Sequence, residues 1–194
     1  MLNLNFTDFP TLHTERLTLK KILRKNYNFI HKLHSDPVTN NFVGRDNATT
    51  LKQAVNYIER INGMVKKKEC LYWVITLSNN DTLIGSVCCW NFDHESDMVE
   101  IGYEMLPEFQ GKGYMKEALR AVIRFTFNNL KAAVITAFPS SDNSNSVAIL
   151  KKLNFVFENQ TYNNKHVNIE NIVTYTLRPF IKTGLNAIVL NLIS

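Results

Sequence analysis

A loop with two glycines, QGKGYM at residues 110–115, separates a strand-like stretch from an amphipathic stretch of helical period. The first stretch is EIGYEML, and in the second, apolar residues recur at positions i, i+3, i+4 and i+7. Glycine permits backbone angles that other residues avoid, and a helix N-terminus offers free N–H groups and the positive end of the helix dipole. The order therefore predicts an anion site suited to a pyrophosphate. A glycine turn without a ligand is the alternative.

Two other phosphate-binding signatures do not fit the sequence. A P-loop needs GxxxxGK followed by Ser or Thr, and no segment supplies it. A dinucleotide fingerprint needs glycine in place of Lys116 and an acidic residue after the next strand, where Ala137 and Phe138 stand. What remains is a strand, a glycine loop and a helix N-terminus that together can cradle a phosphate group.

The remaining elements predict a mixed α/β (α+β) fold. Three extended stretches, 71–77, 83–92 and 98–106, are separated by the turn sequences SNND and NFDHESD, so we expect them to form a β-meander. Other strands are expected at 14–22, 131–138, 155–158 and 169–177, and helices at 26–35, 50–66, 115–130 and 144–153. We expect a mixed, mostly antiparallel central sheet with helices on both faces.

Length and composition suit one domain. The chain has 194 residues, and its hydrophobic content of 45% is enough to close a single core. We expect this domain over residues 1–178 and a C-terminal extension over 179–194. The apolar AIVLNLI of the extension favours a docked helix or strand over a partner contact or a disordered tail.

Charge and cysteine usage narrow the class of protein. Lys and Arg number 22 against 17 Asp and Glu, and the excess is spread along the chain, which favours a solvated surface over a nucleic-acid site. The start MLNLNFTDFP does not read as a leader, and no apolar run reaches about eighteen residues, so we expect a cytoplasmic protein that does not enter a membrane. Cys70, Cys88 and Cys89 lack the spacing of a metal or redox site. We expect reduced, partly buried thiols and no metal.

Two spaced motifs resemble the GNAT superfamily of N-acetyltransferases. Gln110 and Gly113 follow the pattern of its acetyl-CoA loop (Arg or Gln, two residues, Gly, one residue, Gly or Ala), and Met115 departs from the small final residue. NSNSVAILKKLNF, residues 143–155, is similar to a later helix of the family, with Asn154 replacing a glycine that Asn can mimic in a left-handed helix cap. The stretches HTERLTLKKI and LHSDPVTN are similar to the branch of ribosomal-protein N-terminal acetyltransferases.

The resemblance implies transfer of an acetyl group from acetyl-CoA to a primary amine by direct attack. For acetyl-CoA or coenzyme A it implies a binding set of Met105, Leu106, Gln110, Gly111, Lys112, Gly113, Tyr114, Met115, Asn143 and Ser146. A backbone N–H near Met105 or Leu106 would polarise the thioester carbonyl. Glu100 matches the position of a catalytic base, with a solvated residue or a surface salt bridge as the alternative. Glu104 shares its strand face unless a bulge intervenes.

One expected catalytic group is missing from the sequence. Many members of the superfamily carry a tyrosine eight residues after the Asn143 position to protonate the leaving thiolate, and Lys151 stands there. Ser146, or solvent, is expected to substitute. The acceptor pocket of this fold is built by segments such as 26–61 and 159–168, which carry no decisive set of charges. We therefore expect a peptide N-terminus or a small-molecule amine as the acceptor, ahead of a polycation. A homodimer is compatible with the sequence. A non-catalytic module that binds CoA or acetyl-CoA as a sensor or assembly element is the alternative function.

Overall fold

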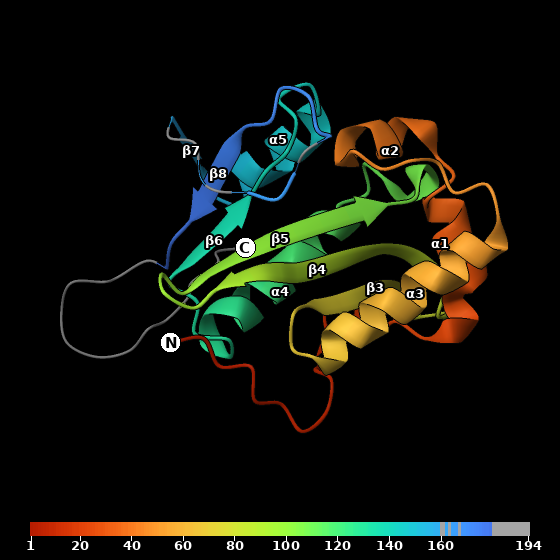
Figure 1. Cartoon of the computed structure of the whole chain (residues 1–194), viewed down its shortest axis with the longest axis horizontal. Coiled ribbons are helices and arrows are strands. Elements are labelled where there is room, and N and C mark those ends of the chain that lie inside the picture. Colours follow the sequence, from red (N-terminus) through yellow and green to blue (C-terminus); the bar gives the residue numbers. More distant parts are fainter. Residues whose placement is uncertain (160–161, 163, 167, 180–194) are drawn as a thin grey trace.

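The computed structural model describes residues 1–159, 162, 164–166 and 168–179, so residues 180–194 of the expected extension, with their AIVLNLI, lie outside the described residues. Within the described part, eight strands form one sheet in the order β1-β2-β3-β4-β5-β6-β8-β7 (Figure 1). Neighbouring strands are antiparallel except β5 and β6, which run parallel, so the mostly antiparallel sheet is confirmed. The strands are β1 (Leu12–His13), β2 (Leu17–Lys21), β3 (Leu71–Leu77), β4 (Leu83–Asp93), β5 (Met98–Met105), β6 (Val134–Ala137), β7 (Val156–Glu158) and β8 (Thr174–Leu177).

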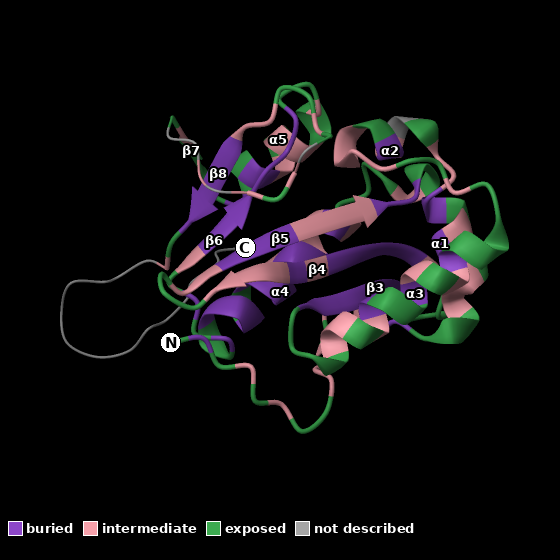
Figure 2. Ribbon diagram, in the orientation of Figure 1, coloured by how far each residue is buried: buried purple, intermediate pink, exposed green. Residues whose placement is uncertain are grey.

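Helices cover both faces of the sheet, as expected. They are α1 (Tyr27–Leu33), α2 (Pro37–Val43), α3 (Leu51–Lys66), α4 (Tyr114–Asn128) and α5 (Ser144–Lys152), with short 3-10 helices at Arg24–Asn26 and Pro107–Phe109. Trp73 and Ile75 of β3 pack into the core beneath α4, while Tyr72 and Val74 pack with α1 and α3. Because β3 is buried on both faces (Figure 2), its residues are nearly all apolar. No helix in the part of the chain that the structure describes is long and apolar enough to cross a membrane.

Helix α2 is absent from the sequence-based expectation, although its signals are local. Asp36 caps it by accepting a hydrogen bond from the Thr39 N–H over 3.0 Å, and Pro37 occupies its first turn. Gly44 ends it in the left-handed conformation, with φ 62°. The helix affects the site because it lies beside the C-terminal end of β5 (Figure 1).

Four strands are shorter than predicted: β6 forms only over Val134–Ala137 and β7 over Val156–Glu158, and β2 and β8 are shortened as well. Of residues 14–22 only Leu17–Lys21 forms β2, since the Thr14 hydroxyl accepts a hydrogen bond from the Leu17 N–H over 3.0 Å and closes a turn. Of residues 169–177 only Thr174–Leu177 forms β8. The residues before β8 pair irregularly with another segment, as when the Val173 N–H donates to the Pro139 carbonyl over 2.9 Å.

The sheet opens between β5 and β6. Their parallel pairing is confined to Met98↔Val134, Val99↔Ile135 and Glu100↔Thr136, whereas β5 continues to Met105. Beyond Glu100, this edge of β5 has no strand beside it among the described residues (Figure 1). The free edge places backbone groups of β5 at the bottom of an opening that faces α5.

Candidate active site

The glycine loop leads from β5 through the 3-10 helix Pro107–Phe109 to α4. Gly111 and Gly113 have φ 75° and 80°, in the left-handed region that favours glycine. A Cβ atom at Gly111 would meet no atom within 4 Å, so the backbone angle, and not a lack of space, requires glycine there. Gln110 turns back toward β5 and donates from Nε2 to the Met105 carbonyl over 2.9 Å. The first N–H groups of α4 have no acceptors within the helix and are available to an anion.

Arg16 connects the N-terminal segment to the start of α4. Its Nε lies 2.7 Å from Glu117 Oε2, its Nη1 donates to the Lys112 carbonyl over 3.3 Å, and its guanidinium carbon lies 4.6 Å from the centre of the Tyr114 ring. Thr14 donates its hydroxyl to Glu117 Oε1 over 2.6 Å. Burial alone would raise the pKa of Glu117, but the hydrogen bonds from Thr14 and Arg16 lower it. The acid in the first turn of α4 is therefore ionised and paired with a cation, which fixes the loop.

Two backbone N–H groups of β5 point into the opening. The Leu106 N–H donates to the Ile84 carbonyl over 3.0 Å, and hydrogen bonding alternates along an antiparallel ladder. The N–H groups of Tyr103 and Met105 therefore point away from β4, toward the free edge. Of the two positions expected to polarise a carbonyl, Met105 keeps an N–H directed at the opening, and Leu106 does not.

These features line a groove of about 750 Å³ between β5, α4 and α5. From the expected acetyl-CoA set, the groove is lined by Met105, Gln110, Gly111, Gly113, Tyr114, Met115, Asn143 and Ser146. Leu106 and Lys112 lie outside its lining. The Lys112 Nζ instead donates to the Glu108 carbonyl over 2.8 Å and lies over the Phe109 ring. A strand edge with free N–H groups next to an anion site fits an extended ligand that ends in phosphates.

Helix α5 places two polar side chains across the groove from β5. Asn143 caps the helix, and its Oδ1 accepts a hydrogen bond from the Ser146 N–H over 3.0 Å, so the Nδ2 donors are the part of this side chain that a ligand can use. The Ser146 Oγ lies 2.8 Å from the hydroxyl of Tyr103. Burial raises the pKa of Tyr103, and the hydrogen bond to Ser146 offsets this only in part, so the phenol is protonated at neutral pH. Lys151, at the position of the family's tyrosine, is exposed.

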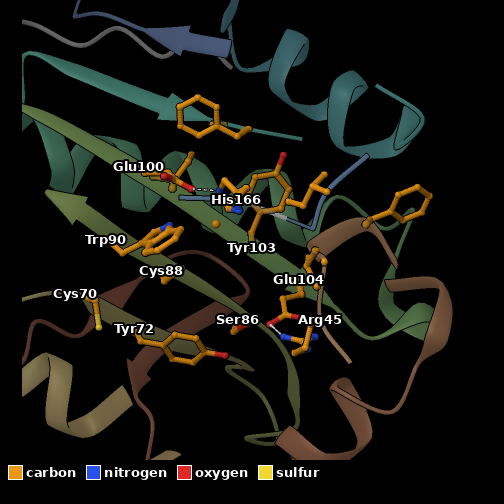
Figure 3. A pocket seen from close by; sticks show the side chains of 18 of the residues that line it. Arg45, Cys70, Tyr72, Ser86, Cys88, Trp90, Glu100, Tyr103, Glu104 and His166 are labelled. Carbon is orange, nitrogen blue, oxygen red and sulfur yellow. Dashed lines mark hydrogen bonds and ion pairs between the residues drawn. The ribbon is translucent and has the colours of Figure 1, made fainter. Parts of the chain in front are cut away.

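A second hollow, a cavity of about 450 Å³, lies on the face of β4 and β5 opposite α4 (Figure 3). Strand β4 contributes Ser86, Cys88 and Trp90 to its lining, and β5 contributes Glu100, Gly102 and Glu104. The register is regular from Gly85↔Met105 to Trp90↔Glu100 and shifts only beyond Trp90. No bulge separates Glu100 from Glu104, and both carboxylates face the cavity.

Glu100 is deeply enclosed, with 2% of its surface exposed. His166 Nε2 lies 2.6 Å from its Oε1, and the Asn91 Nδ2 donates to its Oε2 over 3.2 Å. The rings of Trp90 and Phe138 flank the imidazole, with centroids 5.5 and 5.9 Å from it. A solvated strand residue or a surface salt bridge does not describe a carboxylate in this position.

Glu104 is held by cationic and polar groups. Arg45 Nη2 lies 2.7 Å from its Oε2, and Arg45 Nη1 lies 3.3 Å from its Oε1. His34 Nε2 lies 3.5 Å from Oε1. At this distance the contact is electrostatic and does not meet the geometry of a hydrogen bond. Burial by itself would raise the pKa of Glu104, but His34 and Arg45 lower it to about 2. So acidic a carboxyl group takes up a proton poorly at neutral pH, which makes Glu104 a weak candidate for a base.

The thiols near the cavity are protonated. Burial raises the pKa of Cys70 to about 11 and holds that of Cys88 well above its usual range, and both residues line the cavity. Cys89 is also buried, and burial raises its pKa to about 12. A buried neutral thiol is a poor nucleophile. The site therefore favours direct transfer between two substrates over transfer through a cysteine.

The groove and the cavity meet. The residues that line both are Phe42, Val43, Tyr103, Glu104, Asn143 and Ser146. A ligand that follows the edge of β5 in the groove would present its end to a molecule in the cavity at this junction. The arrangement can therefore bring two substrates together with a buried carboxylate on one side and a hydroxyl pair between them.

Four residues of the site were missed by sequence reasoning: Arg16, Arg45, Tyr103 and His166. Their partners are distant in the sequence, at separations of 101, 59, 43 and 66 residues. Arg16 lies within the matched stretch HTERLTLKKI, which was a usable signal. Arg45 and His166 belong to no periodic pattern, and the strand pattern that contains Tyr103 does not indicate its partner, so these roles depend on the folded arrangement.

Comparison with known proteins identifies the family of the sequence and relatives of the fold. A family model described as an acetyltransferase (GNAT) domain matches residues 16–156. The uncharacterized N-acetyltransferase p20 of Bacillus licheniformis is 31% identical over 146 residues, which cover 75% of this chain and 82% of the relative. A solved structure of a putative ribosomal-protein-serine acetyltransferase from Vibrio cholerae covers 87% of this chain and 97% of its own, with 21% identity and a TM-score of 0.75. A spermidine N-acetyltransferase from Vibrio cholerae, solved with CoA and spermine, covers 85% and 96%, with 18% identity and a TM-score of 0.71.

Proposed function

This chain belongs to the GNAT acetyltransferase family and is an acetyl-CoA-dependent N-acetyltransferase, and we propose that its acceptor is a small primary amine that enters the cavity as a single ammonium group. The observation that carries the proposal is the junction between the groove and the cavity, where Tyr103 and Ser146 line both hollows. The relatives are named N-acetyltransferases, which favours catalysis over a non-catalytic CoA-binding module.

Acetyl-CoA is expected to lie in the groove. Its pyrophosphate is assigned to the N-terminus of α4, where Gly111 and Gly113 shape the loop and the N–H groups have no helical acceptors. Its extended pantetheine arm is assigned to the free edge of β5, in the manner of an added strand. Asn143 contributes its Nδ2 donors from the opposite wall. When bound, the thioester supplies the activated acetyl group.

Backbone donors are expected to polarise the thioester carbonyl. The N–H groups of Tyr103 and Met105 point toward the opening and are fixed by the β4–β5 ladder. Fixed donors aimed at a developing negative charge are effective because they need no reorganisation, and one such donor is worth about 10²- to 10³-fold in rate. Because the donors are main-chain groups, the side chain of Met105 can change without loss of this interaction.

Glu100 is assigned as the base that removes a proton from the acceptor ammonium. The amine must be neutral before it attacks, and Glu100 is the carboxylate of the cavity without a guanidinium partner among the described residues. Glu104 is already neutralised by Arg45. The proton can pass to Glu100 directly or through an ordered water, and general-base catalysis of this kind contributes about 10²- to 10⁴-fold.

The leaving thiolate is assigned to the hydroxyl pair of Ser146 and Tyr103. Both residues stand at the junction, and their oxygens lie 2.8 Å apart. A hydroxyl that donates to the sulfur would hold the charge that develops as the C–S bond breaks. The pair would thus take the place of the tyrosine that is absent at Lys151.

Size and charge of the cavity support a small monoamine as the acceptor. Its volume of about 450 Å³ lies in the lower part of the range for small-molecule sites. A polyamine would need a second unpaired carboxylate, and Glu104 is already paired with Arg45. Trp90 and Phe138 add aromatic surface that suits an ammonium group and an apolar body.

Turnover with defined acceptors tests the proposal. The purified protein is given acetyl-CoA with small monoamines, polyamines or peptides that have a free N-terminus, and free thiol release is followed. We expect kcat/KM to be highest for monoamines with an apolar body. A preference for polyamines or peptides would overturn the acceptor class, and bound acetyl-CoA without acceptor-dependent thiol release would overturn the assigned chemistry.

The Glu100→Gln variant tests the base in the same assay. We expect kcat/KM near neutral pH to fall by about 10²- to 10⁴-fold and to recover partly at higher pH, where more of the amine is neutral. Acetyl-CoA affinity should not change. Glu95→Gln is the matched control, because Glu95 is exposed in the turn between β4 and β5. A Glu100→Gln enzyme with the parent rate and pH profile would exclude Glu100 as the base.

A further inference from the structure

Glu100 meets water through the cavity, and we expect the acceptor to fill that cavity during turnover. Glu100 lies within the sheet, paired with Trp90 of β4 and Thr136 of β6, and is 2% exposed. A base that takes one proton from each acceptor must lose that proton before the next turnover. Its partners at hydrogen-bond distance among the described residues are Asn91 and His166. An amide such as that of Asn91 does not take up protons at neutral pH, whereas an imidazole does.

His166 also lines the cavity and is the more exposed member of the pair. The His166 side chain has 20% of its surface exposed, whereas the Glu100 side chain has 3%. Figure 3 shows the imidazole directed at the carboxylate, with Nε2 2.6 Å from Oε1. The rings of Trp90 and Phe138 flank the imidazole.

We infer that His166 is the proton outlet of Glu100: it takes from the carboxyl group the proton that the acceptor ammonium has lost and passes a proton to solvent. The inference rests on the proposed role of Glu100 as the base. In this role His166 acts through Glu100, so it is a positioning and relay residue.

The proton steps balance. In the first, an N–H bond of the ammonium breaks and an O–H bond forms on Glu100, which leaves a neutral amine and a neutral carboxyl group. In the second, that O–H bond breaks and an N–H bond forms at His166 Nε2, while the Nδ1–H bond breaks and its proton goes to water or buffer. The carboxylate is restored with Nε2–H as its donor. Before the next cycle the imidazole turns toward water, where Nε2 loses its proton and Nδ1 gains one.

Two substitutions at His166 separate relay from orientation. His166→Gln keeps an amide N–H that can reach Glu100 but cannot accept and release a proton. His166→Ala leaves space that free imidazole can enter. We expect kcat with both substrates saturating to fall by about 10-fold or more in each variant, with the KM for acetyl-CoA unchanged. Added imidazole should restore much of the rate of His166→Ala.

Two further proteins make the test specific. Imidazole should not restore His166→Ala/Glu100→Gln, because the relay passes through Glu100. His94→Gln is the matched control and should keep the parent rate, since His94 is exposed in the turn between β4 and β5. Folding of each variant is checked by circular dichroism and by its thermal shift with acetyl-CoA.

The outcomes that overturn the inference are distinct from those that overturn the proposed function. A parent-like kcat in His166→Gln would show that the side chain only orients Glu100. Recovery of the double variant by imidazole would show that imidazole acts on the acceptor itself. In both cases the parent enzyme and Glu100→Gln still report on the acetyl transfer. If His166→Ala does not fold, His166→Gln alone decides the question.

Discussion

The guanidinium of Arg45 lies 2.7 Å from the Glu104 carboxylate in a place where the Glu104 side chain is only 10% exposed. Removing one partner of a buried ion pair leaves an uncompensated charge, which usually costs about 3–5 kcal/mol. We therefore expect Arg45→Met to lower the free energy of unfolding at neutral pH by about 3 kcal/mol, measured by urea denaturation. Arg24→Met is the control, because the pair of Arg24 with Glu59 is exposed and should contribute little.

The same pair predicts how stability depends on pH. The pKa of Glu104 is about 2 in the folded protein against an ordinary value of 4.5, so its contribution is present above about pH 4.5 and is lost as the pH falls toward 2. In Arg45→Met the carboxylate keeps its contact with His34 but loses the guanidinium, so protonation relieves more unpaired charge than in the parent. The stability difference between parent and variant should thus shrink as the pH is lowered through this window. A difference that stays constant would contradict the assignment to Glu104.

Gly113 tests whether the loop geometry serves acetyl-CoA. Its φ of 80° is strained for a residue with a Cβ by about 1–2 kcal/mol, so we expect Gly113→Ala to distort the loop and weaken acetyl-CoA binding about 10-fold in a calorimetric titration. The acceptor KM should change little. Gly63 is the control, because it is exposed in the last turn of α3 with nothing within 4 Å of an added Cβ. Gly63→Ala should raise stability by about 0.5–1 kcal/mol and leave binding unchanged.

Tyr103 and Ser146 are expected to act as a unit on the leaving group. Tyr103→Phe and Ser146→Ala should each lower kcat about 10-fold, with the KM for acetyl-CoA unchanged, and the double variant should be little worse than either. Steady-state kinetics of the four proteins measures the coupling. Effects that multiply in the double variant would mean that the two hydroxyls act separately. Tyr27→Phe, on α1 and outside the lining of both hollows, is the control.

Local patterns were enough to predict much of the fold. The meander of β3, β4 and β5 and the helix α4 lie close to their expected ranges, because a period of two residues or of 3.6 residues is visible in a short window. Asn154 adopts φ 63°, the left-handed conformation expected of a residue that replaces glycine after a helix. The common face of Glu100 and Glu104 also followed from strand period alone.

Long-range partners could not be predicted in this way. Arg45 and His166 come from irregular segments and meet carboxylates 59 and 66 residues away, so no periodic signal connects them. The engagement of the Leu106 N–H depends on which residue of β4 lies opposite, and register is a property of two strands together. The contact between Tyr103 of β5 and Ser146 of α5 joins elements 43 residues apart, so no local pattern of the sequence indicates it.

The divergence of β5 from β6 after three residue pairs divides the sheet into two parts, with β1 to β5 on one side and β6, β8 and β7 on the other. A ligand in the groove contacts β5 on one wall and α5 on the other, so it bridges these parts as a non-covalent cross-link. Its binding free energy is then added to the work needed to separate them. The free energy needed to separate the two parts of the sheet would therefore rise with the concentration of acetyl-CoA, as would the rate of turnover.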